Sequence, residues 1–225
     1  HHIAADGWSM SVLINELSAF YDAFAAGKQP SLAPLTIQYS DFARWQRNRL
    51  KGDVLEGELA YWLKLLVDLP VAHSLPLDRP RSDQQSFAGH NINTRVDAST
   101  SRALIKLCQS QDCTLFMGLF GAFSLLLSRY SNEDDITIGT SVANREQTEI
   151  SSLIGCFINT LVLRCDLSNQ PDFITLLKQC KQTMRTVQTN HEHDSHTPCT
   201  KLKIHHAHGS HNPCTQFNKN MNIIK

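Results

Sequence analysis

The sequence lacks an excess of charge of either sign, because 21 basic and 21 acidic side chains balance over 225 residues. A neutral chain gives no electrostatic reason to expect nucleic acid or an anionic membrane surface as its partner. Apolar runs of the roughly 18 residues that span a bilayer are also lacking, so we expect no membrane partner. The seven cysteines include no CxxC pair, and this usage is typical of reduced thiols in a cytoplasmic protein.

Apolar residues repeat at helical spacing in the first third of the chain. The pattern predicts helices over residues 10–26, 40–52 and 53–69. Ser40 or Asp41 is expected to cap the second helix, since both residue types favour that position. The side chains expected to face the core are Leu13, Leu17, Phe20 and Phe24 in the first helix, Phe42 and Trp45 in the second, and Leu55, Leu59, Trp62 and Leu66 in the third.

After residue 70 the pattern changes. Segment 70–90 is rich in proline and polar residues and has no helical period, so we interpret it as a linker. Beyond it, alternating and continuous apolar runs predict strands mixed with helices, and therefore a fold of the α/β or α+β class. The expected strands cover 91–97, 135–145 and 157–166, and the expected helices cover 99–111, 114–130 and 173–187.

The chain opens with two adjacent histidines, His1 and His2, which Asp6 and Gly7 follow. A metal site needs a third and a fourth ligand at defined distances, so these residues alone support one weakly. A structural interpretation packs His2 and lets the Asp6 carboxylate favour the start of the next helix. A catalytic interpretation uses a histidine that titrates near neutrality to accept a proton and return it, while Gly7 permits a tight turn. The spacing alone leaves these interpretations open.

Five stretches of the sequence together carry a family resemblance. HHIAADGWSM resembles the HHxxxDG motif of condensation domains of nonribosomal peptide synthetases. YSDFARWQ, IGTSVANR and LIGCFINTLVLRCDLS resemble later core motifs of that family, and LPLDRPR resembles the connection to its second lobe. They occur in the family's order over residues 1–190, so the chain is identified as a member of this family by resemblance.

The resemblance implies a chloramphenicol-acetyltransferase-like fold of two similar lobes, with a tunnel between them. It divides this chain into a partial first lobe at 1–80, part of the second lobe at 81–190, and a tail at 191–225. The implied reaction is amide formation, in which the α-amine of an acceptor aminoacyl group attacks the thioester of a donor aminoacyl or peptidyl group. The implied partners are upstream and downstream peptidyl carrier domains and an adjacent adenylation domain. Both substrates would be held on phosphopantetheine arms of the carriers, and no cofactor or metal is expected in the domain itself.

The same resemblance assigns roles to individual residues. His2 would remove the proton as the amine attacks, or would position the amine. Asp6 would brace the loop by pairing with an arginine, which we expect on a strand that precedes residue 1. The implied catalytic residues are His2, Asp6, Gly7 and His1, and the implied tunnel residues are Trp8, Ser9, Gly155 and Asn159.

The tail departs from the family's pattern. HEHDSHTPCTKL and SHNPCTQFNKNMN retain fragments of two late family motifs but lack their aromatic and apolar positions. We expect this tail to be poorly ordered and interpret it as a frameshift or a sequence error. The alternative is adventitious zinc binding by His205, His206, His208 and His211 with Cys199 and Cys214.

Three functions are compatible with these residues. Condensation is the leading hypothesis, and DGWSM, YSDFARWQ and CFINT favour it, with an L-configured donor. An epimerization domain of the same superfamily is the first alternative. An inert, truncated domain with at most a domain-binding role is the second. Without the strands expected before residue 1, the chain alone is not expected to be a stable, active monomer, because sheet edges and helix faces lose their partners.

Overall fold

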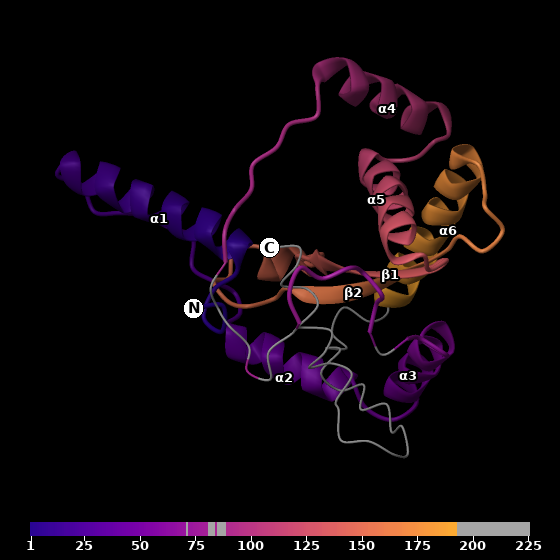
Figure 1. The fold of residues 1–225 in the computed structure, drawn as a ribbon. Coiled ribbons are helices and arrows are strands. Elements are labelled where there is room, and N and C mark those ends of the chain that lie inside the picture. The colour runs from indigo at the N-terminus through magenta and orange to yellow at the C-terminus, as the bar shows by residue number, and fades with distance from the viewer. Residues whose placement is uncertain (71, 81–83, 85–88, 193–225) are drawn as a thin grey trace. The chain divides into compact units, whose positions relative to one another are not determined.

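A computed structural model describes residues 1–70, 72–80, 84 and 89–192 of the chain (Figure 1). Helices and strands are mixed over this part, which confirms the predicted class. The predicted tail at 191–225, with its histidine and cysteine cluster, lies almost wholly outside the described residues. The elements are α1 Gly7–Ala25, α2 Tyr39–Arg49, α3 Asp53–Leu65, α4 Ala98–Ser110, α5 Leu115–Ser131, β1 Asp135–Val142, a 3-10 helix at Thr148–Ile150, β2 Asn159–Asp166 and α6 Phe173–Glu192.

The described residues form two compact units. Of the described residues, unit 1 contains 1–60 and 141–160, and unit 2 contains those within 61–140 and 161–192. Each unit is therefore assembled from segments that are far apart in the sequence. The lobe boundaries inferred from the resemblance, after residues 80 and 190, stay a prediction.

The two N-terminal helices of unit 1 begin at well-formed caps. Asp6 is the N-cap of α1, and its carboxylate accepts a hydrogen bond of 2.8 Å from the backbone N–H of Ser9. The predicted cap of α2 at Ser40 or Asp41 was wrong, because Gln38 occupies the N-cap. Asp41 lies in the first turn instead, where its carboxylate accepts a 2.9 Å bond from the Gln38 N–H. This satisfies a backbone donor that the helix itself leaves unpaired.

The core of unit 1 lies between α2 and the segment that leads into β2. Phe42 of α2 packs with Ile150, Leu153 and Phe157 in one buried cluster. The rings of Phe42 and Phe157 are 4.7 Å apart between centroids, and Tyr39 meets Phe157 edge to face at 5.1 Å. Aromatic pairs in this geometry add to the stabilisation that burial gives. The prediction that Phe42 faces inward is thereby confirmed.

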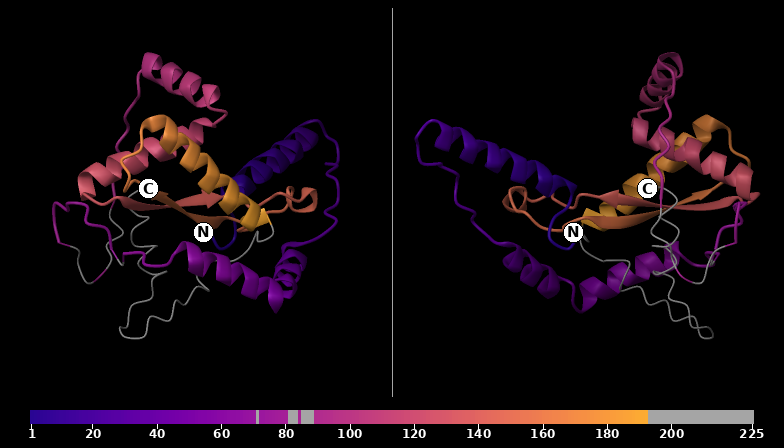
Figure 2. Two further views of the ribbon diagram at one scale, coloured as in Figure 1. Left: turned by 90° about the vertical axis from the view of Figure 1, so that its right-hand side faces the viewer. Right: turned by 60° about the vertical axis from the view of Figure 1, so that its left-hand side comes forward.

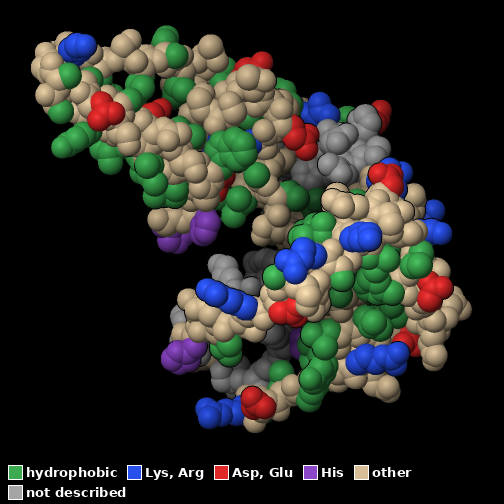
Figure 3. All heavy atoms as spheres, turned by 90° about the horizontal axis from the view of Figure 1, so that it is seen from above, with side chains coloured by type: hydrophobic (Ala, Val, Ile, Leu, Met, Phe, Trp, Pro, Cys, Tyr) green, Lys and Arg blue, Asp and Glu red, His purple; other side chains and the backbone are tan. Residues whose placement is uncertain are grey.

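The long helix α1 does not bury the face that its periodicity predicts. Leu17 is 65% exposed and Phe24 is 62% exposed, so the expectation that this stripe faces a core is wrong for the described chain. Figure 3 shows hydrophobic side chains spread over the surface that α1 forms. The physical reason is that α1 has no extensive packing contact with another described helix or strand. The exposed apolar side chains of α1 are Trp8, Met10, Leu13, Ile14, Leu17, Phe20, Tyr21 and Phe24.

Unit 2 is built on three helices and the β1–β2 pair. α5 packs against both α4 and α6, and Figures 1 and 2 show α5 and α6 side by side on one face of the strands. Cys108 of α4, Cys113 and Leu177 of α6 form the buried core of this packing. The predicted inward stripe of the last helix is confirmed at Leu177, Cys180 and Val187, which are all buried.

Strands β1 and β2 pair in a two-stranded sheet. The N–H of Leu167, just after β2, donates to the carbonyl of Asp134, just before β1, at 2.7 Å. The start of β1 therefore lies beside the end of β2, and the strands are antiparallel. The predicted strand at 91–97 was wrong: the segment pairs with no strand among the described residues, and Ile92 is 92% exposed. Asp97 instead caps α4.

The length and hydropathy of the described helices bear on whether one of them could span a membrane. None of them alone combines the length and the hydropathy that a membrane span requires. The pair α4 and α5 meets the requirement together, by length and composition only, and it bends by 109° at the break.

Candidate active site

The histidine motif lies in a turn at the start of unit 1, directly before α1. The N–H of Ala4 donates to the carbonyl of His1 at 3.0 Å, which closes the turn. The Nδ1 atom of His1 accepts a 3.2 Å hydrogen bond from the Ile3 N–H. The His2 side chain is exposed at the surface of the unit, so the alternative that packs it inside is not supported. Both histidines are exposed, and the ring of His1 is in addition tied to the local backbone.

Asp6 is buried, in contrast to the exposed His2, because only 1% of its surface is accessible to solvent. Its Oδ1 atom accepts hydrogen bonds from the Ser9 N–H at 2.8 Å and from the Arg145 guanidinium at 3.1 Å. Its Oδ2 atom accepts a 3.0 Å bond from the N–H of Phe157. The Ser9 hydroxyl lies 2.7 Å from Oδ1 as a further donor. A carboxylate held by this many donors is a structural anchor and is not available to accept a proton from a substrate.

The electrostatics of Asp6 agree with this geometry. Burial by itself raises the pKa of Asp6, because it disfavours the charged form. The hydrogen bonds from Ser9, from the Phe157 N–H and from Arg145 act in the opposite direction and outweigh burial. The net pKa of Asp6 is lower than that of an ordinary aspartate, so the group stays ionised at neutral pH.

The arginine that pairs with Asp6 comes from within this chain. We expected it on a strand before residue 1, and that expectation is wrong. Arg145, the last residue of the IGTSVANR stretch, forms the buried ion pair with Asp6. The side chain of Arg145 is 1% exposed and that of Asp6 is 0% exposed. Its Nη1 atom also donates to the carbonyls of Ile150 at 2.8 Å and Leu153 at 2.7 Å. One guanidinium thus fixes the loop before β2 and the cap of α1 together.

Aromatic rings complete the surroundings of Arg145. Its guanidinium carbon lies 3.9 Å from the centroid of the Phe157 ring, within the range of a cation–π contact. The Trp8 ring lies farther away, at 6.0 Å, and its Nε1–H donates to the carbonyl of Ser151 at 2.9 Å. Trp8, which was predicted to line a tunnel, therefore ties the first turn of α1 to the loop before β2.

Ser9 and Gly155 form the second link between α1 and that loop. The Ser9 hydroxyl accepts a hydrogen bond from the Gly155 N–H at 3.0 Å and lies 2.8 Å from its carbonyl oxygen. The same carbonyl accepts a 3.1 Å bond from the Asp6 N–H. A side chain at Gly155 would collide with the Tyr39 ring, because Cε2 of that ring lies 2.5 Å from an ideal Cβ. Gly155 is therefore required for close approach, and Ser9 is fully buried beside it.

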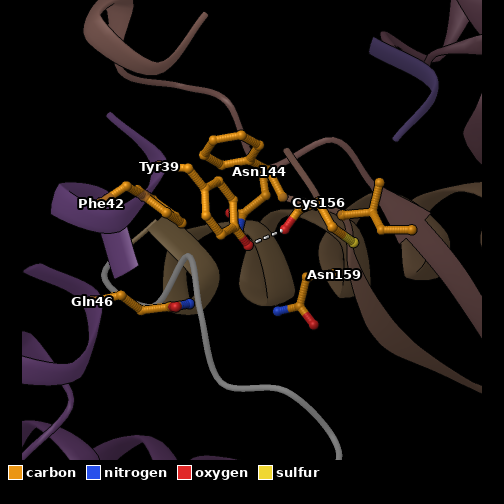
Figure 4. Close-up of a pocket in the computed structure, with 8 residues that line it drawn as sticks. Tyr39, Phe42, Gln46, Asn144, Cys156 and Asn159 are labelled. Carbon is orange, nitrogen blue, oxygen red and sulfur yellow. Dashed lines mark hydrogen bonds between the residues drawn. The ribbon is translucent and has the colours of Figure 1, made fainter. Parts of the chain in front are cut away.

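Gly7 and Asn159 occupy different surroundings. Gly7 is the first residue of α1, and a Cβ there meets no atom within 4 Å, so this glycine is not explained by close packing. Asn159 begins β2 and lines a cavity of about 170 Å³ in unit 1. Figure 4 shows its amide in that cavity together with Gln46 and Asn144. The structure thus brings Asp6, Ser9, Trp8 and Gly155 into one network, and places Asn159 at the adjacent cavity.

Sequence reasoning missed two contributors to this site. Arg145 lies in a stretch that was recognised as a motif, but its partner is 139 positions away, and spacing cannot reveal such a pair. Tyr39, the first residue of YSDFARWQ, donates its hydroxyl to the carbonyl of Cys156 at 2.8 Å. For Arg145, the signal in the sequence was a charged residue at the end of an apolar strand pattern. A buried arginine without a partner is unfavourable, so this position pointed to a charged partner.

No group of three or more His, Cys, Asp or Glu side chains among the described residues is arranged to hold a metal ion. The chemistry that this arrangement offers is that of an exposed imidazole on a rigid support. A histidine can accept or return a proton near neutral pH. The support is the α1 cap, which an ion pair and several hydrogen bonds to the loop before β2 hold in place.

Comparison with known proteins places these features in a family. The sequence model of the Condensation domain family matches residues 1–219. Malpibaldin synthetase of Mortierella alpina is 47% identical over 192 residues, which cover 85% of this chain and 4% of that protein. The chain thus spans a small fraction of the length of this relative.

Two solved structures extend the comparison. The X-domain in its complex with OxyB from teicoplanin biosynthesis is 29% identical, with a TM-score of 0.80 over 88% of this chain and 44% of that one. The holo form of AB3403, a four-domain nonribosomal peptide synthetase bound to AMP and glycine, is 25% identical, with a TM-score of 0.72 over 85% of this chain and 14% of that one. Both share the arrangement of helices and strands described above.

Proposed function

Because this chain belongs to the condensation-domain family, we propose that it catalyses amide bond formation in nonribosomal peptide synthesis. The α-amine of an acceptor aminoacyl group attacks the carbonyl carbon of a donor aminoacyl or peptidyl thioester. The carbon–nitrogen bond forms, the carbon–sulfur bond breaks, and the amine proton ends on the departing thiol. The observation that carries the proposal is the exposed His2, which directly precedes a helix cap locked by the buried pair of Asp6 and Arg145.

The proposed chemistry demands little base strength. A free α-amine titrates near pH 8, so a useful fraction is already neutral at physiological pH. His2 takes the proton from the attacking nitrogen or holds that nitrogen in line with the thioester. Asp6 is a positioning residue, because its carboxylate is buried and already accepts four hydrogen bonds. His1 shapes the turn that presents His2, and Gly7 begins the helix that follows.

The proposed partners follow from the tethered substrates. Donor and acceptor arrive on phosphopantetheine arms of an upstream and a downstream peptidyl carrier domain, with an adenylation domain beside them. Holding two reactants in line replaces an encounter in solution, and this contribution can exceed that of proton transfer. The domain itself needs no bound cofactor for these steps. The proposed donor has the L configuration.

The experiment uses the full polypeptide that carries this domain, with its carrier domains loaded with defined donor and acceptor aminoacyl groups. We expect the amide product on the acceptor carrier in a single turnover, detected by mass spectrometry, with an L-donor preferred over its matched D-donor. Inversion of the donor α-carbon without amide formation would identify an epimerization domain instead. A clear preference for the D-donor would refute the stereochemical part alone.

A second candidate function is a binding role without catalysis. The observation that favours it is the likeness to the X-domain, which was solved as a complex with another protein. In the same assay, this function predicts no amide and no inverted donor for any loaded pair. Retention of the loaded carrier domains by the immobilised domain would then separate a binding module from an inert one.

A further inference from the structure

A cavity of about 170 Å³ lies in unit 1, beside the network that holds Asp6. Its walls come from three separate stretches of sequence: α2, the end of the IGTSVANR stretch, and the loop before β2 with the first residue of that strand. Figure 4 shows the labelled side chains around it. Those on which the inference rests are Tyr39, Phe42, Gln46, Asn144, Cys156 and Asn159.

The described side chains that line the cavity are uncharged but not purely apolar. Three carboxamides, those of Gln46, Asn144 and Asn159, stand opposite aromatic rings and a thiol. Burial raises the pKa of Tyr39 and of Cys156, so both groups are neutral at physiological pH. A charged guest would lose its hydration here without gaining a counter-charge from these described side chains, which is strongly unfavourable.

The size of the cavity sets the size of the guest. An apolar protein cavity of about 150 Å³ is large enough to take up benzene. The cavity of about 170 Å³ therefore has room for a side chain of leucine or phenylalanine size. Aromatic walls favour the apolar body of such a guest, and the carboxamides can bond to a polar atom at its end.

The wall of the cavity is rigidly connected to the histidine motif. The N–H of Phe157, whose ring lines the cavity, donates to the Asp6 carboxylate at 3.0 Å. The Tyr39 hydroxyl holds the carbonyl of Cys156 at 2.8 Å. A guest in the cavity is thus positioned by the same loop that fixes the cap of α1, directly after His2.

We infer that this cavity is a specificity pocket that receives the uncharged side chain, of leucine or phenylalanine size or smaller, of one of the two aminoacyl substrates. The inference rests on the proposed amide-forming function. Gln46 and Asn159 are the specificity-determining residues, since they come from opposite walls and limit the length of the guest. Whether the side chain belongs to the donor or to the acceptor is decided by the arms of the experiment.

The binding arm uses Cys156 as a reporter. Among the described cysteines it alone is partly exposed, whereas Cys108, Cys113, Cys165 and Cys180 are buried. We expect L-leucyl-aminopantetheine, a stable amide analogue of a loaded arm, to slow alkylation of Cys156 by iodoacetamide at least about tenfold, read by peptide mass mapping. The L-aspartyl analogue is the matched charged control and should leave the rate unchanged. Equal protection by both analogues, or by neither, would overturn the inference without any variant.

The activity arm uses the full polypeptide with loaded carrier domains. Gln46→Trp fills the cavity and should lower kcat/KM for leucyl substrates at least about tenfold relative to glycyl ones, since a single methylene in an apolar pocket is already worth roughly 10–200-fold. Gln46→Ala should admit tryptophanyl substrates. Gln109→Ala, on the exposed surface of α4, is the matched control and should change neither ratio. Varying the donor and the acceptor separately identifies which side chain is read.

The outcomes separate the inference from the proposed function. If the wild-type protein forms no amide with any loaded pair, the proposed function fails. If it forms amides, but both Gln46 variants keep the wild-type ratios of kcat/KM, the proposed function stands and the specificity pocket is refuted.

Discussion

An arginine–aspartate pair of unit 1, Arg145 with Asp6, and one of unit 2, Arg164 with Asp135, differ in how far water reaches them. The side chains of Arg145 and Asp6 are 1% and 0% exposed, whereas those of Arg164 and Asp135 are 24% and 36% exposed. A buried pair is stable only when good geometry and further hydrogen bonds offset the lost hydration. A partly exposed pair keeps much of its hydration and contributes less.

The two arginines also have different partners. Arg164 contacts both oxygens of Asp135, with its Nη2 atom at 2.7 Å from Oδ2, and its Nη1 atom donates to the carbonyls of Leu65 and Val67. It joins β2 to β1 and to the end of α3. Arg145 instead fixes a loop against the cap of α1, next to the histidine motif. The buried pair therefore determines the geometry of the site, whereas the partly exposed pair supports the fold.

Removing Arg145 should have the largest effect. Arg145→Ala leaves Asp6 charged, buried and short of its counter-charge, and breaking such a pair costs roughly 3–5 kcal/mol. Chemical denaturation of the purified domain measures the loss. Arg145→Lys is the matched control: it keeps the charge but loses the fork that reaches Asp6 and the carbonyls of Ile150 and Leu153 together, so its loss should be intermediate. A cost for Arg145→Ala no larger than that of Arg164→Ala would contradict the comparison.

Acid should weaken the buried pair in a predictable direction. The pKa of Asp6 is lowered in the folded state, so its stabilising contribution is complete above the unfolded pKa of about 4 and is lost as the pH falls through the folded value. At pH 7, the free energy of unfolding of Asp6→Asn should therefore be lower than that of the wild type. Between pH 5 and acid conditions, the free energy of unfolding of Asp6→Asn should fall less than that of the wild type. Parallel stability–pH curves for the two proteins would show that Asp6 is not the group responsible.

A methyl group at Gly155 should disturb the same region by crowding. An added Cβ would overlap the Tyr39 ring, and Cε2 of Phe157 lies 3.0 Å from it. Overpacking of this kind costs roughly 1–3 kcal/mol. Gly89→Ala is the matched control, since a Cβ at Gly89 meets no atom within 4 Å. Equal denaturation midpoints for both variants would mean that the Tyr39 ring moves aside freely.

Substitutions that remove the partly exposed ion pairs should cause the smallest losses of stability. Arg164→Ala should cost about 1–2 kcal/mol, from the ion pair and the two carbonyl hydrogen bonds together. Lys181→Ala removes an ion pair to Asp112, a residue whose side chain is 88% exposed, and should shift the denaturation midpoint by no measurable amount. A larger loss for Lys181→Ala than for Arg164→Ala would break the relation between exposure and contribution.

Local features of the fold could be predicted from the sequence. The positions of α1, α4, α5, α6, β1 and β2 follow from periodicity and capping residues, which act over a few neighbours. The predicted strand at 91–97 failed because alternation describes a strand only when another strand pairs with it. The apolar stripe of α1 failed for a similar reason, since periodicity shows that a face is apolar and not what packs against it.

In the candidate site, too, local features could be predicted from the sequence and long-range contacts could not. Asp6 as a cap follows from its position before a helical pattern, and the motif resemblance selects His2. The Asp6–Arg145 pair joins residues 139 positions apart, and the cavity is assembled from three distant stretches. Long-range pairs of this kind depend on the folded chain, so a single sequence does not reveal them.

The most direct measurement is the single-turnover rate of amide formation by His2→Ala, in the full polypeptide that carries this domain. We predict a rate at least about tenfold below that of the wild type, since general acid–base help contributes roughly 10²–10⁴-fold. The denaturation midpoint should stay unchanged, because the His2 side chain is exposed. His1→Ala, at the neighbouring position, is the comparison and should retain more activity. Near-wild-type turnover by His2→Ala would contradict the assignment of His2 as the residue that carries the chemistry.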